Sequence, residues 1–268
     1  MKRVRPVSRA VLAAVLSLCI WLPASEGRAA GAWEWTLVPY LWATDIGMEV
    51  KISDETILDT DVAFGDLLDK VDLAFSAHFE GRRGKGGFLL DLTYISLSNE
   101  MTLSSSSGVP PQLDGAVIDT EVDLAIVEAG GFYRPGGEKT GLDVLFGIRY
   151  IGIDQKFDIT PALPPPLDSP ILIESSPSLT DGFVGLRYSG TLGKKWGYAI
   201  RGDIGAGGTE LTLNGIAGMS YQIGKSGRYG LRFGYRYMDM EIDEEKDGTR
   251  VETDMTMSGI YAGIAFQW

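Results

Sequence analysis

Cysteine and histidine are almost missing from this chain of 268 residues, which has one of each, Cys19 and His78. A single cysteine cannot form an intrachain disulfide, and one histidine leaves no Cys/His ligand set for zinc. No phosphate-binding loop, dinucleotide fingerprint or EF-hand spacing appears either. We therefore expect no cofactor and no metal, and we expect the protein not to be an enzyme.

Long apolar runs are also missing beyond residue 30, and basic residues are in the minority. A helix that spans a membrane needs about 20 consecutive apolar residues, so any insertion must be by β-strands. The chain has 36 acidic and 24 basic residues, a formal net charge of −12. This acidity argues against nucleic acid as a partner.

The N-terminal segment has the pattern of an export signal. Four basic residues precede residues 10–24, which are almost wholly apolar. This run of 15 residues is short for a membrane anchor helix, the alternative interpretation, and typical of a signal peptide. We predict cleavage near Ala30, with Ala24 as a second possibility. Residues 1–30 are then a signal peptide that contains Cys19, and residues 31–268 form one domain without cysteine.

The rest of the chain alternates between apolar and polar residues, the period of a β-strand. In strand 142–150, for example, Leu142, Val144 and Phe146 oppose Asp143 and Gly147. Each such segment is near the length that a tilted strand needs to cross a bilayer. We predict ten strands, with eight or twelve as alternatives: 33–44, 72–83, 87–103, 117–133, 142–157, 180–192, 196–206, 211–223, 228–242 and 251–268.

The predicted connections alternate in length. Those at 84–86, 135–141, 193–195 and 224–227 are short, whereas 45–71, 104–116 and 159–179 are long. Short turns at one end and long loops at the other are typical of outer-membrane barrels. Within the first long loop, residues 64–71 have the pattern of a short amphipathic helix. The predicted fold class is therefore all-β, a closed antiparallel transmembrane barrel.

The polar face of the strands carries charged residues of both signs. A Gly-x-Arg-Tyr pattern occurs three times, at 147–150, 185–188 and 234–237. It suggests that Gly and Arg point inward while Tyr lies at the lipid interface. Glu128 fits less well, because it shares the parity of Leu124 and Ile126, so a β-bulge or an interfacial position would be needed there. We predict a lumenal charge network of Glu34, Glu80, Asp91, Glu121, Asp123, Asp143, Arg149, Asp181, Arg187, Arg201, Asp203, Arg232 and Arg236.

The last strand ends on aromatic residues, with Ile264, Phe266 and Trp268 on one face. This ending resembles the C-terminal signal by which assembly machinery recognises outer-membrane barrels. Together with the segments 33–42, 64–68, 185–188 and 201–205, it makes the whole predicted mature chain resemble small, uncharacterised outer-membrane β-barrel proteins of Gram-negative bacteria. The resemblance implies an outer-membrane location with both termini in the periplasm. Expected partners are outer-membrane lipid, lipopolysaccharide and, during insertion, the barrel-assembly machinery.

Three functions remain open. The first is a structural barrel or a weak passive pore for small solutes, because a ten-stranded barrel with a charged lumen leaves little room for water. The second is a surface receptor or adhesin that acts through the acidic loop 45–71 and the proline-rich loop 159–179. The third is a lipid-modifying enzyme that uses His78, with Ser76 and Glu80 on the same strand face. Residues two apart on a strand are about 6.6–6.8 Å apart, too far for a direct Ser–His hydrogen bond.

Overall fold

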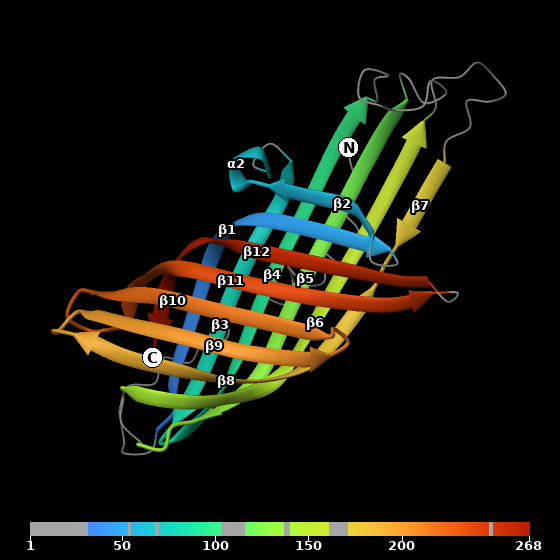
Figure 1. The fold of residues 1–268 in the computed structure, drawn as a ribbon. Helices are drawn as coiled ribbons and strands as arrows, with labels where there is room; N and C mark the ends of the chain where they lie inside the picture. Colours follow the sequence, from blue (N-terminus) through green and yellow to red (C-terminus); the bar gives the residue numbers. More distant parts are fainter. Residues whose placement is uncertain are drawn as a thin grey trace.

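The protein folds into one closed antiparallel β-barrel in a computed structural model (Figure 1). The structure describes residues 32–52, 55–67, 70–102, 116–136, 140–160, 171–246 and 249–268. The predicted signal peptide 1–30 lies outside these residues, as do most of loop 104–116 and the proline-rich stretch 162–170. Among the described residues, no helix is long and apolar enough to cross a membrane.

All ten predicted strands are present, and the first pairs with the last. β1 pairs with β12 over almost its whole length, from Thr36 opposite Gln267 to Ile52 opposite Val251. This pairing closes the sheet and removes its open edges, which confirms the predicted fold class. The barrel strands are β1 (Glu34–Ile52), β3 (Val71–Arg83), β4 (Gly86–Thr102), β5 (Val117–Tyr133), β6 (Gly141–Thr160), β8 (Ser178–Leu192), β9 (Trp196–Gly207), β10 (Leu211–Ile223), β11 (Tyr229–Lys246) and β12 (Thr249–Gln267).

The connections divide between the two ends of the barrel as predicted. The end that carries turns 84–85, 134–140, 193–195 and 224–228 is called the short-turn end here, and the opposite end is the loop end. Gly84 and Gly193 have positive φ angles of 60° and 73°, which glycine adopts without steric cost. At the short-turn end, Trp35 and Trp268 exchange two backbone hydrogen bonds of 3.0 and 3.2 Å. These bonds bring the ends of β1 and β12 together.

Two predicted loops contain strands of their own. β1 continues to Ile52, and β2 (Glu55–Val62) folds back against it. β7 (Ile171–Ser175) pairs with the end of β6. These two strands extend the sheet beyond the ten-stranded wall at the loop end (Figure 1). Within the predicted helix at 64–71, the described residues form one helical turn, α2 (Phe64–Leu67), which buries Leu67.

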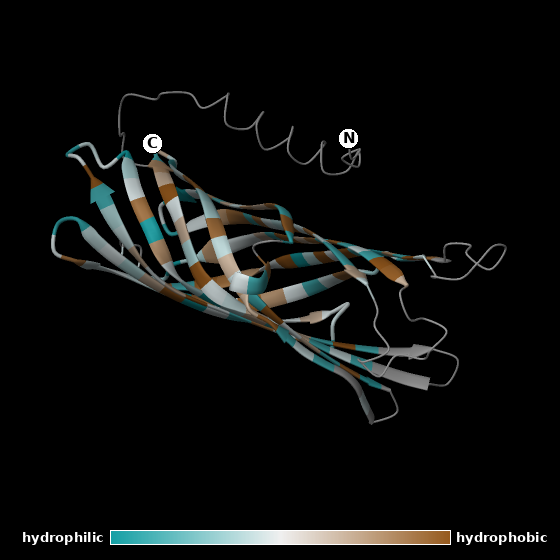
Figure 2. Cartoon of the chain, turned by 90° about the horizontal axis from the view of Figure 1, so that it is seen from above, coloured by the Kyte–Doolittle hydropathy of each residue, from teal (hydrophilic) through white to brown (hydrophobic). Residues whose placement is uncertain are grey.

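The barrel wall reverses its polarity along its length. In β6, Val144, Phe146 and Ile148 point outward and are exposed, while Arg149 is buried inside. Toward the loop end of the same strand, the inward residue Ile153 is buried and the outward Asp154 is exposed. Inward and outward positions still alternate through this change, and Figure 2 shows hydrophilic and hydrophobic residues following one another along the strands. Only the chemistry of the two faces has changed.

β11, which three strands separate from β6 in the sheet, shows the same reversal. In β11, the outward face changes from Tyr235 and Tyr237 to Asp239, while the inward face changes from Arg236 to Met238. We call the part of the barrel with the apolar exterior the membrane half and the other part the loop half. The interior of the loop half is a hydrophobic core that contains Trp42, Ile95, Leu124, Ile126, Ile151, Ile153, Met238, Met240, Met255 and Met257.

This reversal corrects the prediction for β5. Glu128 needs no β-bulge, because it pairs in regular register with Asp91 on β4 and Arg149 on β6 and points into the lumen. Leu124 and Ile126 share its parity because they also point inward, into the core of the loop half. By the same alternation, Glu121 and Asp123 lie on the outer face, not in the lumen as predicted, and Glu121 is exposed.

Close strand packing in the wall can be tested at glycine. A Cβ atom on the inward Gly234 of β11 would lie 2.1 Å from the Ala217 carbonyl oxygen. We expect Gly234→Ala to lower the free energy of unfolding by about 1–3 kcal/mol, because backbone atoms have to move. The measurement is a urea titration of the barrel in detergent. Gly215→Ala on β10 is the control, since nothing lies within 4 Å of its Cβ position; equal effects of the two changes would contradict the packing.

Candidate functional site

The lumen of the membrane half is lined by charges of both signs in equal number. Seven carboxylates have inward strand positions: Glu34, Glu80, Asp91, Glu128, Asp143, Asp181 and Asp203. Seven arginines share this interior: Arg82, Arg134, Arg149, Arg187, Arg201, Arg232 and Arg236. His78 lies among them. The balance allows most of these buried charges to find a partner inside the barrel.

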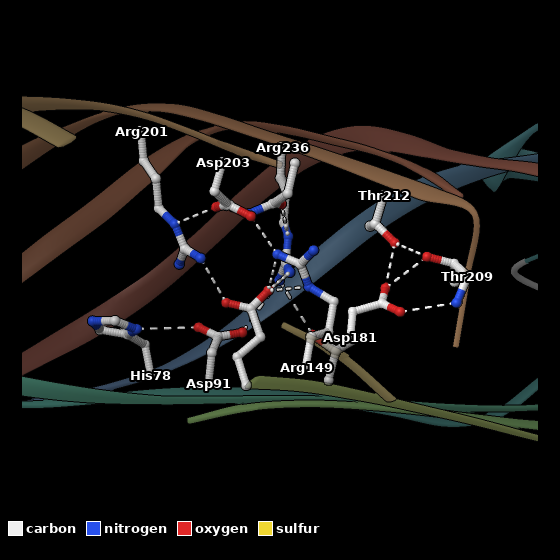
Figure 3. Close-up of polar contacts among 12 residues, drawn as sticks. His78, Asp91, Arg149, Asp181, Arg201, Asp203, Thr209, Thr212 and Arg236 are labelled. Carbon is white, nitrogen blue, oxygen red and sulfur yellow. Dashed lines mark hydrogen bonds and ion pairs between the residues drawn. The ribbon is translucent and has the colours of Figure 1, made fainter. Parts of the chain in front are cut away.

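Glu128 is the centre of the network, and its three partners Arg149, Arg201 and Arg236 are labelled in Figure 3. Its Oε1 accepts hydrogen bonds from Arg149 Nε at 3.0 Å and from Arg236 Nη2 at 3.3 Å. Its Oε2 accepts one from Arg201 Nη2 at 2.8 Å. Three arginines from β6, β9 and β11 therefore converge on one carboxylate from β5. Charge-assisted hydrogen bonds of this kind are the strong ones in proteins.

Asp203 closes the same cluster from β9. It accepts hydrogen bonds from Arg149 Nη2 at 2.5 Å and from Arg201 Nε at 2.7 Å. Asn214 on β10 donates to Asp203 at 2.8 Å and accepts from Arg236 Nε at 3.2 Å. These side chains are almost completely buried, so the cluster fills the centre of the lumen.

Asp91 connects Arg236 to the opposite wall. Arg236 Nη1 donates to Asp91 Oδ1 at 3.2 Å and to the Tyr40 hydroxyl at 3.0 Å. Tyr40 in turn donates to Asp91 Oδ1 at 2.9 Å. The guanidinium of Arg236 also lies 4.7 Å from the ring centroid of Trp42, a cation–π contact. Trp42 therefore lies at the boundary between the charged lumen and the hydrophobic core of the loop half.

A second cluster lies nearer the short-turn end. Arg187 on β8 donates to Glu80 at 2.5 Å and to Asp143 at 2.9 Å. Arg134 binds both oxygens of Asp143, at 2.5 and 2.6 Å. His78 joins the two clusters, with Nδ1 3.1 Å from Asp91 and Nε2 3.5 Å from Glu80. Charged contacts thus continue across the lumen from β3 to β11.

The structure separates four predicted members from this network. Asp181 accepts hydrogen bonds from Thr209 and Thr212 at the β9–β10 turn instead of from an arginine (Figure 3). Arg232 has no ion-pair partner within 4 Å among the residues that the structure describes. Glu34 is not one of these four: it keeps its inward position at the short-turn end of β1, opposite Arg82 of β3 in the sheet register. Glu121 and Asp123 lie on the outer face, as described above.

Sequence reasoning missed the central residue and two of the seven arginines, Arg82 and Arg134. Glu128 was visible as the one acid that breaks the apolar parity of its strand, which is the signal that could have identified it. Arg134 follows the last residue of β5, where no alternation remains to assign its direction. Its side chain nevertheless turns into the lumen, where it is 2% exposed.

The predicted C-terminal signal lies in an aromatic girdle at the short-turn end. Ile264 is exposed on the outer face, and the Phe266 ring packs edge-on against Tyr229 with centroids 5.9 Å apart. The Trp268 ring lies 6.5 Å from that of Phe79. Aromatic residues at this position are typical of barrels at the membrane interface. Recognition of these three residues by assembly machinery stays a prediction.

Ser76 and His78 do not form a catalytic pair. The Ser76 hydroxyl donates to Thr93 at 3.3 Å, while both nitrogens of His78 face carboxylates. A nucleophilic serine needs its base within hydrogen-bond reach. The arrangement of the lumen is therefore suited to holding charges in place and to excluding water.

Comparison with known proteins shows similarity of fold without a close relative. No family model and no curated protein matches the chain. Among solved structures, the chain is similar to Ail, the attachment invasion locus protein of Yersinia pestis, with 12% identity, 85% of this chain and 98% of that chain covered, and a TM-score of 0.32. It is also similar to the Escherichia coli outer membrane protease OmpT, with 7% identity, 91% of this chain and 99% of that chain covered, and a TM-score of 0.46. A third similar structure is the Pseudomonas putida toluene transporter TodX, with 12% identity, 90% of each chain covered and a TM-score of 0.31.

The energetic importance of the network can be tested at Arg201. Arg201→Leu leaves Glu128 and Asp203 with one partner fewer inside the barrel. We expect the free energy of unfolding to fall by about 3 kcal/mol, because a buried charge loses its compensation. The measurement is a urea titration, together with the heat-modified shift on gels. Arg228→Leu, at an exposed turn position, should change stability by less than about 0.5 kcal/mol. An Arg201 variant as stable as this control would refute the network's contribution.

Proposed function

We propose that this protein is an outer-membrane β-barrel with a sealed lumen, a structural barrel rather than an open pore. The observation that carries the proposal is the burial of the charge network. Arg149, Asp143 and Asp203 have side chains that are 0% exposed, although they lie in the interior where a channel would run. Water therefore does not reach the centre of the lumen. A solute would have to break several buried ion pairs to pass, and each would cost several kcal/mol.

The outer surface supports insertion in a membrane. Aliphatic and aromatic side chains of β6, β8, β9, β11 and β12 are exposed around the membrane half, including Phe146, Val184, Ile200, Phe233 and Ile260. In water such a surface would be an aggregation hazard, whereas in lipid it is the expected exterior of a barrel. We expect outer-membrane lipid and lipopolysaccharide to cover this band.

The orientation follows from the two ends. Short turns on the periplasmic side and longer connections outside are the rule for outer-membrane barrels. We therefore expect the short-turn end, with Trp35 and Trp268, to face the periplasm. The loop half then projects from the membrane surface, with its acidic outer face in water.

Conductance in a planar bilayer tests the sealed lumen. We expect the wild-type barrel to give no reproducible conductance steps. Glu128→Ala should produce small, anion-selective steps, because three arginines lose their shared carboxylate and the site takes up water. Glu121→Ala, on the outer face, is the matched control and should stay silent. Regular steps from the wild-type protein would show that it is a pore.

A surface receptor is the second candidate, and the projecting loop half favours it. β2 and β7 extend the wall at the loop end, and the proline-rich stretch 162–170 directly precedes β7 in the sequence. Outward residues such as Glu49, Asp154 and Asp239 give this part an acidic exterior. Deletion of residues 162–170 should then abolish binding of the receptor's ligand at the cell surface, while the barrel itself still folds.

A lipid-modifying enzyme has less support, since His78 is held between Asp91 and Glu80. We expect His78→Ala to leave the lipid profile of the cell envelope unchanged, because no nucleophile within the described lumen depends on it. Mass spectrometry of extracted envelope lipids is the measurement. A change that wild-type protein reverses, and that Ser76→Ala reproduces, would instead support catalysis.

A further inference from the structure

The hydrophobic core of the loop half has two walls of different chemistry. The wall formed by β4, β5 and β6 presents branched aliphatic side chains, such as Ile95, Leu124 and Ile153. The opposite wall, formed by β1, β11 and β12, presents methionines. Five of the chain's eight methionines lie there: Met48, Met238, Met240, Met255 and Met257. Packing alone does not require thioethers on one side only.

The sheet register arranges four of these methionines as a rectangle. Each strand carries a Met-x-Met pair, with Met238 and Met240 on β11 and Met255 and Met257 on β12. Met238 lies opposite Met257, and Met240 lies opposite Met255. Met48 on β1 lies opposite Met255 from the other side. All five point inward, and the four at the corners are at most 5% exposed.

The dimensions of this rectangle suit a single metal ion. Directly opposite Cβ atoms in antiparallel strands are about 5 Å apart, and residues two apart on one strand are about 6.7 Å apart. The centre is then about 4 Å from each Cβ. A methionine sulfur is two bonds beyond Cβ on a flexible chain, so all four thioethers can reach a common point.

We propose that this methionine cluster is a site for Cu(I). Thioether sulfur is a soft ligand that selects Cu(I) among the common metals. The described residues of the core cluster around it are hydrophobic, and none of them offers a carboxylate oxygen that would favour a harder ion. A single positive charge costs less to bury than the double charge of Zn²⁺ or Ca²⁺. The outward carboxylates of Asp239, Glu241 and Asp254 flank the same strands and attract cations to this end of the barrel.

The proposed ligands are thioethers, and histidine, cysteine and carboxylate side chains take no part in the site. No cluster of three such residues suited to a metal is present among the described residues, and the sequence led us to expect no metal. The site is independent of whether the lumen conducts, because it lies on the loop side of the Arg236 and Glu128 cluster. A barrel that binds no Cu(I) would therefore overturn the copper site and leave the proposal of a sealed lumen unaffected.

The experiment is an anaerobic titration of the purified full-length mature barrel with Cu(I) against a chromogenic Cu(I) chelator. We expect the wild-type protein to withhold one equivalent of Cu(I). Met238→Leu/Met257→Leu should lower the affinity at least tenfold, whereas Met101→Leu/Met219→Leu should not change it. Met101 is exposed and Met219 lies on the outward face of β10, so this pair is a matched control. Leucine has nearly the volume of methionine, and the core should tolerate the change.

X-ray absorption of the wild-type complex gives a second readout that needs no variant. We expect a first shell of sulfur alone, which in a mature chain without cysteine identifies thioethers. The proposal is overturned if the wild-type protein yields all its Cu(I) to the chelator, if the Met238/Met257 variant withholds it as strongly, or if the shell contains nitrogen or oxygen. The first two outcomes would mean that the methionines only fill the core.

Discussion

The need to compensate buried charge inside a closed sheet is the constraint on which this structure depends. Closing ten strands places alternate residues in a narrow interior, and in the membrane half many of these are ionised. Glu128 resolves the problem by joining three arginines from separate strands. Inward glycines provide the room: a Cβ on Gly205 would lie 3.4 Å from Nη1 of Arg149. Pairing the charges thus joins strands that are distant in sequence, and the paired side chains are almost completely buried at the centre of the barrel.

The reversal of polarity along the wall follows from a change of solvent, not of backbone. Strand geometry sends every second residue inward at both levels. Where lipid lies outside, apolar residues such as Phe146 and Phe233 face it, and the charges are kept inside. Where water lies outside, acids take the outer face, and Met238 and Ile153 form a core like that of a soluble protein. In the placement proposed above, one barrel combines a membrane-embedded half with a half that projects into water, and the two interiors differ in chemistry.

The strands and turns could be predicted because they depend on local periodicity. The ten segments, the short-turn end and the closing strand all follow from alternation that is read within about ten residues. The extension of β1 to Ile52 and the two extra strands β2 and β7 were missed, because these segments themselves read as an acidic loop and a proline-rich loop. Glu121 and Asp123 were assigned to the lumen for a similar reason. Charged residues point inward only in the membrane half, so inferring the direction of these two side chains from their charge requires the level at which the polarity of β5 reverses. No single strand records that level.

The class of fold could be predicted from the amino-acid sequence alone. The alternation of apolar and polar residues specifies which side chains share a face, and the length of each alternating segment is that of a strand that crosses a membrane. The sequence also determined that inward arginines would have carboxylates available. Only the tertiary structure decided which face is inside at each level and which charges meet. Arg149 and Asp203 are 54 residues apart, and Arg236 and Asp91 are 145 apart. The physical reason is that alternation within a strand is local, whereas register and closure are cooperative properties of the whole sheet. Partners across a lumen are set only once the last strand has joined the first.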